Sequence, residues 1–249
     1  MRSALSKRWV KGIIAGVFWV GVWAIVAHIY KMDFVLPSPI TTLKALTQNI
    51  TDASFWAAVL WSTAKILCGF SLASVLGFIL SVAGIKFRFI RTLFDPFCVS
   101  LRAVPVASFI ILVLVMFSSR NVSLIISFLM AFPVIYSTLS GGTDSADEKL
   151  LETAKIFKMS FLRRLRFIYL PTLKPFLSSA LSVGCGLAFK SGVAAEVIGF
   201  PKGSVGEAMY LSKVAFDMPE MLSYTVVIVI ISVSIEKALG LLFRKGGRV

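Results

Sequence analysis

The chain has 249 residues, of which 57% are apolar and only 15% are charged, and its mean hydropathy is +0.88. This composition excludes a soluble globular domain and is typical of an integral membrane protein. The formal net charge is +14, but the basic residues are distributed over several loops. The charge therefore does not indicate a nucleic-acid-binding surface, and we expect an all-α integral membrane protein.

Apolar segments divide the chain into candidate membrane spans. A helix needs about 20 residues to cross the hydrocarbon core of a bilayer. We predict one transmembrane domain with six spans, at about 12–30, 57–85, 99–119, 121–143, 173–197 and 221–242. Residues 1–11 form a basic lead-in, and residues 144–172 are the longest polar interruption.

The positions of lysine and arginine predict the orientation. Basic residues are concentrated in residues 1–11, in Lys86–Arg91, in the 144–172 loop and after residue 236. Because basic loops remain in the cytoplasm, both termini and the 144–172 loop should be cytoplasmic.

Prolines mark irregular points along the chain. Ser38 as a cap and Pro39 in the first helical position predict a short helix before the second span. Pro105 enters the third span and Pro133 lies within the fourth, and each should bend its helix.

The 144–172 loop carries signals for two short helices. Ser145 and Glu148 have the spacing of a capping box, which predicts a helix from Glu148 to Lys158. Ser160 should begin a second, basic helix, and Pro171 should end the helical pattern. The first helix has one apolar face, which comprises Leu150, Leu151, Ala154, Phe157 and Phe161. An amphipathic and a basic helix on one loop indicate a docking site for a cytoplasmic partner.

Two charged residues lie in the fifth span, Lys190 and Glu196. A charge within a span costs about 2.5–3.5 kcal/mol on insertion scales, so it usually faces protein or water. Six residues on a helix correspond to about 240°, so the two side chains should not pair with each other. Either each pairs with another helix, or Lys190 faces a translocation path and favours an anionic solute. Candidates for this path are Lys190, Ser191, Gly192 and Glu196.

The sequence offers no catalytic or metal-binding constellation. Cys68, Cys98 and Cys185 have no C-x-x-C spacing, and a phosphate-binding glycine-rich loop is absent. We therefore expect no enzymatic activity, no bound cofactor and no metal.

The 144–172 loop resembles a motif of bacterial ABC-importer permeases, E-A-A-x-x-x-G followed by I-x-L-P. Glu152-Thr153-Ala154 occupies the first part, Lys158 the glycine, and Ile168-Tyr169-Leu170-Pro171 the end. Thr153 and Lys158 depart from the motif. The resemblance implies a helix that couples to an ATPase through Glu152, Thr153, Ala154, Phe157, Lys158, Leu170 and Pro171.

Other segments are similar to permeases of the taurine, aliphatic sulfonate and nitrate type. These are Leu36-Pro37-Ser38-Pro39, Arg102–Pro105, Phe132–Thr138 and the stretch Ala188–Gly199. The resemblance implies the type I ABC importer permease fold, with six transmembrane helices and a cytoplasmic coupling helix, in a bacterial inner membrane. A small anion such as a sulfonate, taurine or nitrate is the expected substrate.

The resemblance also implies partners. These are cytoplasmic ABC ATPase subunits that bind ATP, a second permease subunit, an external substrate-binding protein and the lipid bilayer. A homodimer is expected, and a heterodimer stays open. Two other functions stay open as well: the same machinery for a pyrimidine-type vitamin precursor, and a secondary transporter, which should show inverted repeats.

Overall fold

The computed structural model describes residues 2–30, 32–33 and 35–245, and these residues form helices joined by short turns. The all-α prediction is therefore confirmed. The helices are α1 (Arg2–Tyr30), α2 (Pro39–Asn49), α3 (Ala53–Lys86), α4 (Arg88–Ala103), α5 (Val106–Met116), η1 (Ser119–Asn121), α6 (Val122–Asp144), α7 (Glu148–Ile156), α8 (Phe161–Arg164), η2 (Leu165–Tyr169), α9 (Leu170–Gly199), α10 (Val205–Val214) and α11 (Met218–Lys245).

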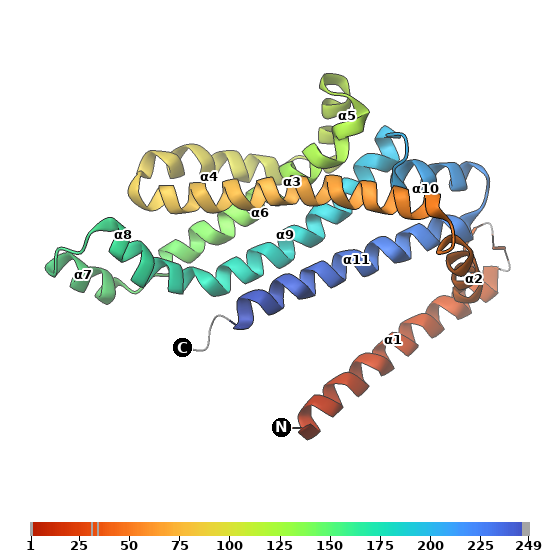
Figure 1. Cartoon of the computed structure of the whole chain (residues 1–249), viewed down its shortest axis with the longest axis horizontal. Helices are drawn as coiled ribbons and strands as arrows, with labels where there is room; N and C mark the ends of the chain where they lie inside the picture. Colours follow the sequence, from red (N-terminus) through yellow and green to blue (C-terminus); the bar gives the residue numbers. More distant parts are fainter. Residues whose placement is uncertain (1, 31, 34, 246–249) are drawn as a thin grey trace.

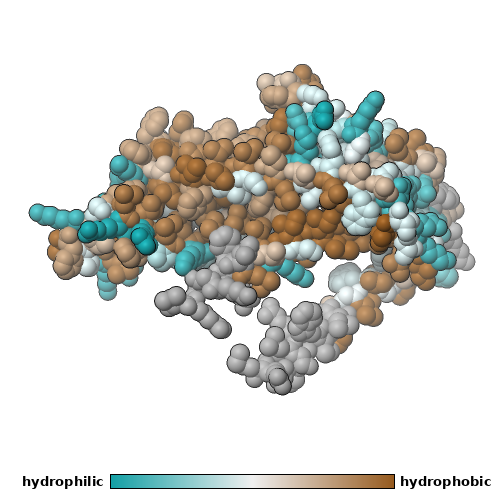
Figure 2. Space-filling model, in the orientation of Figure 1, coloured by the Kyte–Doolittle hydropathy of each residue, from teal (hydrophilic) through white to brown (hydrophobic). Residues whose placement is uncertain are grey.

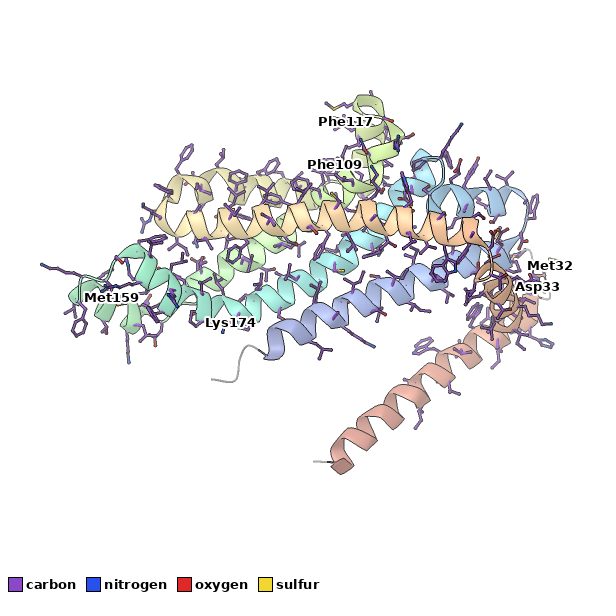
Figure 3. The ribbon with its side chains drawn as sticks, viewed as in Figure 1. Met32, Asp33, Phe109, Phe117, Met159 and Lys174 are labelled. Atoms are coloured by element: carbon purple, nitrogen blue, oxygen red, sulfur yellow. The ribbon has the colours of Figure 1, made fainter. Side chains whose placement is uncertain are left out.

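Three long helices form the centre of the molecule. α6 packs against both α3 and α9, and α11 packs against the other side of α9 (Figure 1). α7 and α8 project at one end of these helices, and α10 and α2 lie at the opposite end. We call these the α7 end and the α10 end. In Figure 3, Met159 lies at the α7 end and Asp33 at the α10 end.

Small residues allow α3 and α6 to approach closely. A Cβ atom on Gly69 would lie 2.2 Å from the carbonyl oxygen of Leu124, and one on Gly77 would lie 3.0 Å from the Ile135 side chain. Glycines in membrane helices commonly mark such contacts. These two therefore fix the spacing of the two helices.

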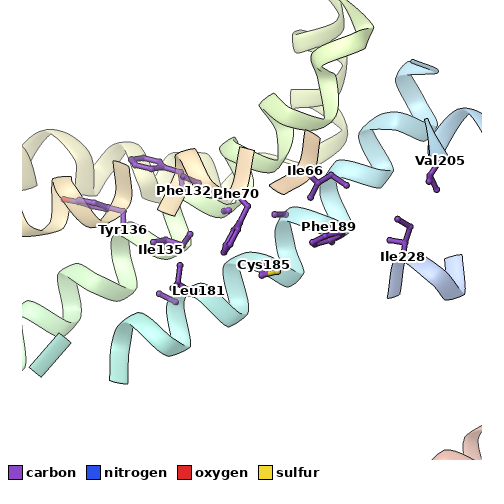
Figure 4. Close-up of a cluster of buried hydrophobic side chains, with 14 of the residues drawn as sticks. Ile66, Phe70, Phe132, Ile135, Tyr136, Leu181, Cys185, Phe189, Val205 and Ile228 are labelled. Atoms are coloured by element: carbon purple, nitrogen blue, oxygen red, sulfur yellow. The ribbon is translucent and has the colours of Figure 1, made fainter. Parts of the chain in front are cut away.

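Aliphatic and aromatic side chains together fill the core around α3, α6 and α9 (Figure 4). The ring of Phe132 stacks between Phe128 and Tyr136, with centroid distances of 5.6 and 6.1 Å. The Tyr136 hydroxyl donates a hydrogen bond of 2.8 Å to Asp95. The polar tip of a core aromatic is thus satisfied where α4 covers α6.

The surface matches a protein that crosses a bilayer. Figure 2 shows apolar residues over the middle of the visible face and polar residues gathered at both ends. In the described part of the chain, α3, η1–α6, α8–α9 and α11 are long and apolar enough to span, and α4 with α5 makes a fifth candidate if the bent pair is one span. Ile14–Tyr30 of α1 is a shorter apolar helix. The number six remains a prediction.

Proline has different effects at different positions. At Val104 and Pro105 the chain leaves the helical conformation, and α4 and α5 are bent by 103°. The predicted span 99–119 is therefore not one straight helix, because the residue before a proline avoids the helical region. α6, in contrast, continues through Pro133.

The prediction that Pro171 ends the helical pattern is wrong. The helix runs unbroken from Phe161 to Gly199 through a wide π-helical turn at Leu165–Tyr169, in which the amide of Leu170 donates to the carbonyl of Leu165. Pro171 falls in the first turn of α9. In an unbroken helix a proline ring clashes with the carbonyl four residues before it, and the wide turn directly before Pro171 relieves this clash.

Candidate functional site

The α7 helix begins at a different cap from the predicted one. Asp147, not Ser145, caps it, and its Oδ1 accepts a hydrogen bond of 2.9 Å from the Lys149 amide. Ser145 still belongs to the end of α6, where its hydroxyl donates to the carbonyl of Gly141. The predicted capping box is therefore wrong, because Asp147, which is an equally favoured capping residue, stands immediately before the helix. The short helix that Ser160 should begin is present as α8, although the Ser160 side chain makes no capping bond.

The α7 helix ends in a Schellman motif, two residues earlier than predicted. The Met159 amide donates to the carbonyl of Ala154 at 2.9 Å, and the Lys158 amide donates to that of Lys155 at 3.0 Å. Lys158 has a φ of 48°. This left-handed conformation favours glycine, which explains the glycine in the motif that the loop resembles. Lys158 makes the same turn with a side chain.

One side of α7 packs against the start of the long helix. Ala154 is 1% exposed and forms a small cluster with Ala146 and Ile168, against which Leu151 and Met159 pack. This contact connects the E-A-A part of the motif directly to its I-x-L-P part. The resemblance alone gives no such contact.

The other side of α7 is exposed and partly apolar. Phe157 is 75% exposed, and Leu150 is exposed with it, so the predicted apolar face is divided between two directions. Glu152, Thr153, Lys158 and Pro171 are exposed, and Leu170 is 36% exposed. We define the α7 surface as the exposed residues Leu150, Glu152, Thr153, Ile156, Phe157 and Leu162.

Lys190 lies in a groove nearer the α10 end. The groove has a volume of about 350 Å³ and is formed by α9, α10 and α11. The Lys190 side chain has no hydrogen-bond or ion-pair partner among the described residues. The lining residues are mostly apolar: Gly186, Phe189, Lys190, Val193, Met209, Thr225, Ile228, Val229, Ser232 and Val233. A single cation in an apolar groove is suited to an anion that has shed part of its hydration.

The other three path candidates lie between helices. The Ser191 hydroxyl is buried and donates to the carbonyl of Leu187 within α9 at 2.7 Å. A Cβ atom on Gly192 would lie 2.5 Å from the Ser127 hydroxyl and 2.6 Å from Ile66. Gly192 is therefore a packing contact of α9 with α3 and α6. The structure does not place these residues with Lys190 on the groove.

Glu196 is fully buried at the α10 end of α9. Its Oε2 accepts a hydrogen bond of 2.6 Å from the Ser62 hydroxyl and one of 3.4 Å from the Gly206 amide. It is not paired with Lys190, as the helical angle predicts, and its contact with α3 agrees with the interpretation that it pairs with another helix. Sequence reasoning missed Ser62 and Gly206 as its partners, because no local pattern connects residues so far apart.

Comparison with known proteins agrees with this architecture. A family model described as "Binding-protein-dependent transport system inner membrane component" matches residues 73–244, which is more than half of the chain. The matched region contains the α7 loop, the Lys190 groove and Glu196.

Three relatives are similar over most of their length. The putative aliphatic sulfonates transport permease protein SsuC of Bacillus subtilis is 26% identical and covers 78% of this chain and 71% of its own. The taurine transport system permease protein TauC of Escherichia coli is 27% identical and covers 73% of this chain and 69% of its own. The nitrate import permease protein NrtB of Synechocystis is 25% identical and covers 71% of this chain and 66% of its own. The chain belongs to the family of inner membrane components of binding-protein-dependent transport systems.

Proposed function

We propose that this protein is the permease subunit of an ATP-driven importer and forms the path of a small anion delivered by an external binding protein. The observation that carries the proposal is the α7 surface, an exposed apolar patch at the end of a membrane bundle in a chain of this family. An exposed apolar patch of this kind marks a protein interaction site.

The contact between α7 and the long helix supports a coupling mechanism. Ala154 packs on Ile168, and the helix that contains Ile168 continues to Gly199 past the groove of Lys190. A movement imposed on the α7 surface by an ATPase would therefore reach the groove through one rigid element. The ATPase would bind and hydrolyse ATP, and this chain would change the side to which the groove opens.

The partners follow from this assignment. Two ATPase subunits would dock at the α7 end, which we assign to the cytoplasm because the loop is rich in lysine and arginine. A second permease subunit, most simply another copy of this chain, would complete the path within the inner membrane. Both termini would be cytoplasmic.

The substrate class is proposed from Lys190 and from what the relatives are named for. A sulfonate, taurine or nitrate carries an anionic group that a lysine in an apolar groove could accompany. A neutral pyrimidine-type vitamin precursor would not need this charge. Uptake of labelled taurine, nitrate and a pyrimidine should therefore be compared in Lys190→Gln and Lys190→Arg. Loss of anion uptake in the first and its retention in the second supports an anion, with Lys213→Gln as the control for an exposed lysine outside the groove.

Reconstitution with the cognate ATPase tests the coupling role. Glu152→Arg reverses a charge on the α7 surface and should abolish stimulation of ATP hydrolysis by loaded binding protein, whereas Glu152→Gln should reduce it less. Unchanged stimulation in Glu152→Arg would refute coupling through this surface. Uptake by the permease alone, driven by an ion gradient without ATP, would favour a secondary transporter.

A further inference from the structure

Glu196 joins three helices at the α10 end through a short hydrogen-bonded network. The Val205 amide donates to the Ser62 hydroxyl at 2.9 Å, and this hydroxyl donates to Glu196 Oε2 at 2.6 Å. The same oxygen accepts from the Gly206 amide at 3.4 Å. Ser62 belongs to α3, Glu196 to α9, and the two amides to the first turn of α10.

The network satisfies the start of α10. The first amides of a helix have no partner within it and need acceptors from elsewhere. Ser62 and Glu196 supply acceptors to the first two, and the hydroxyl of Ser204 accepts from the Glu207 amide at 3.0 Å. Two of the three acceptors thus come from other helices, so the position of α10 depends on α3 and α9.

Backbone contact at the same place requires a glycine. A Cβ atom on Gly206 would lie 2.3 Å from the backbone carbon and the Cβ of Glu196, and 2.4 Å from the Val197 amide nitrogen. Such an approach is closed to any residue with a side chain. α10 therefore begins directly on the backbone of α9, at the residue whose carboxylate holds it.

Burial of the Glu196 carboxylate costs free energy, and its hydrogen bonds are made to defined partners. Glu196 is 0% exposed, and its described hydrogen-bond partners are a hydroxyl and an amide rather than a lysine or arginine. Its Oε1 is buried near the hydroxyl of Ser123 on α6, and neither atom forms a hydrogen bond of normal geometry. The positive end of the α10 dipole offsets part of the cost. A buried acid of this kind is retained where its geometry has a function.

We propose that Glu196 is a positioning residue that makes α10 move as one unit with α9. α10 contributes Met209 to the groove in which α9 places Lys190. A fixed contact between the end of α9 and the start of α10 keeps the groove in one shape while the bundle moves. The role in transport rests on the proposed function, whereas the contact itself can be tested on the permease alone.

Amide hydrogen exchange of the purified permease in lipid nanodiscs tests the contact. Ser62→Ala removes the acceptor of Val205, and the exchange of that amide should become about fivefold faster, which corresponds to about 1 kcal/mol for one net hydrogen bond. Ser74→Ala is the matched control, because Ser74 is on the same helix and donates only to the carbonyl of Phe70. Exchange of Val205 at the wild-type rate in Ser62→Ala would overturn the proposal.

Substitutions of Glu196 separate positioning from general stability. Glu196→Gln keeps an oxygen for Ser62 and Gly206 and should leave the exchange of residues 205–207 close to that of the wild type. Glu196→Ala should accelerate exchange there by about tenfold, because both bonds of the carboxylate are lost. Equal exchange in the two variants would contradict the proposed role of the acceptor.

Uptake by the reconstituted complex tests the consequence for transport. In Glu196→Ala the maximal uptake rate should fall while stimulation of ATP hydrolysis by the loaded binding protein persists, and Glu196→Gln should restore uptake. Faster exchange with unchanged uptake would overturn the positioning role. If the wild-type complex shows no ATP-dependent uptake, the proposed function fails, and the exchange result still decides whether Glu196 holds α10.

Discussion

Arg91 and Asp144 form an ion pair, with Nη1 of the arginine 2.5 Å from Oδ1 of the aspartate. Arg91 also donates a hydrogen bond to the hydroxyl of Thr143. The pair joins the first turn of α4 to the last residue of α6, four residues before α7 begins. Sequence reasoning used Arg91 only as a basic residue that sets the orientation. The structure makes it the attachment of α4 to the base of the α7 loop.

Arg91→Gln should therefore weaken the attachment without unfolding the bundle. The ion pair is partly exposed, so a double-mutant cycle with Asp144→Asn should give a coupling energy of about 0.5–1 kcal/mol. Arg88→Gln is the control, since Arg88 lines one cavity together with Arg91 and Asp144 but makes no ion pair in the described structure. A coupling energy of zero, measured from thermal unfolding of the four proteins, would show that the pair contributes nothing.

Lys158→Gly should stabilise the end of α7. A non-glycine residue at a φ of 48° is strained, and relief of this strain is worth about 1 kcal/mol. Lys155→Gly, inside the same helix, should instead destabilise it by about 1 kcal/mol. Amide exchange across residues 148–159 measures both changes. Equal effects of the two substitutions would mean that the conformation of Lys158 is not the cause.

Phe157→Ala should separate docking from folding. Because the side chain is 75% exposed, its removal should leave the melting temperature of the permease nearly unchanged. Co-purification of the ATPase should decrease severalfold, since exposed aromatic residues contribute strongly to interfaces. Ala154→Leu is the contrasting variant, because Ala154 is buried against the long helix and a larger side chain should disturb the loop itself. Full ATPase recovery with Phe157→Ala would place the docking surface elsewhere.

Gly69→Ala should separate α3 from α6. The added methyl group would meet the backbone of Leu124, and overpacking of this kind typically costs about 1–3 kcal/mol. Gly186→Ala adds the same group where, apart from the nearby backbone of α9 itself, no atom lies within 4 Å. The difference in melting temperature between these variants isolates the contact. A Gly69→Ala protein as stable as Gly186→Ala would refute the close packing of the two helices.

Local signals predicted much of this fold. Ser38 and Pro39 start α2 where expected, because cap and first-turn preferences depend on neighbouring residues alone. The angle between Lys190 and Glu196 around the helix correctly predicted that their side chains do not pair with each other. Residue types also predicted helices in the 144–172 loop, which are present as α7 and α8.

Contacts between residues far apart in the sequence were not predicted. Ser62 and Glu196 are 134 residues apart, so their hydrogen bond has no trace in either local sequence. The strong proline signal at Pro171 failed because tertiary packing and a wide turn outweighed it. The apolar face of α7 was assigned to one direction, although the helix has both a side that packs inward and a side that is exposed.

The unbroken helix from Phe161 to Gly199 has 39 residues, which corresponds to a length of about 58 Å. The hydrocarbon core of a bilayer is about 30 Å thick, so almost half of this helix extends beyond it. A partner docked on the α7 surface would therefore be held at a distance from the lipid headgroups that the length of this helix sets. Changes in membrane thickness should alter the tilt of this helix and leave the height of the docking surface within the complex unchanged.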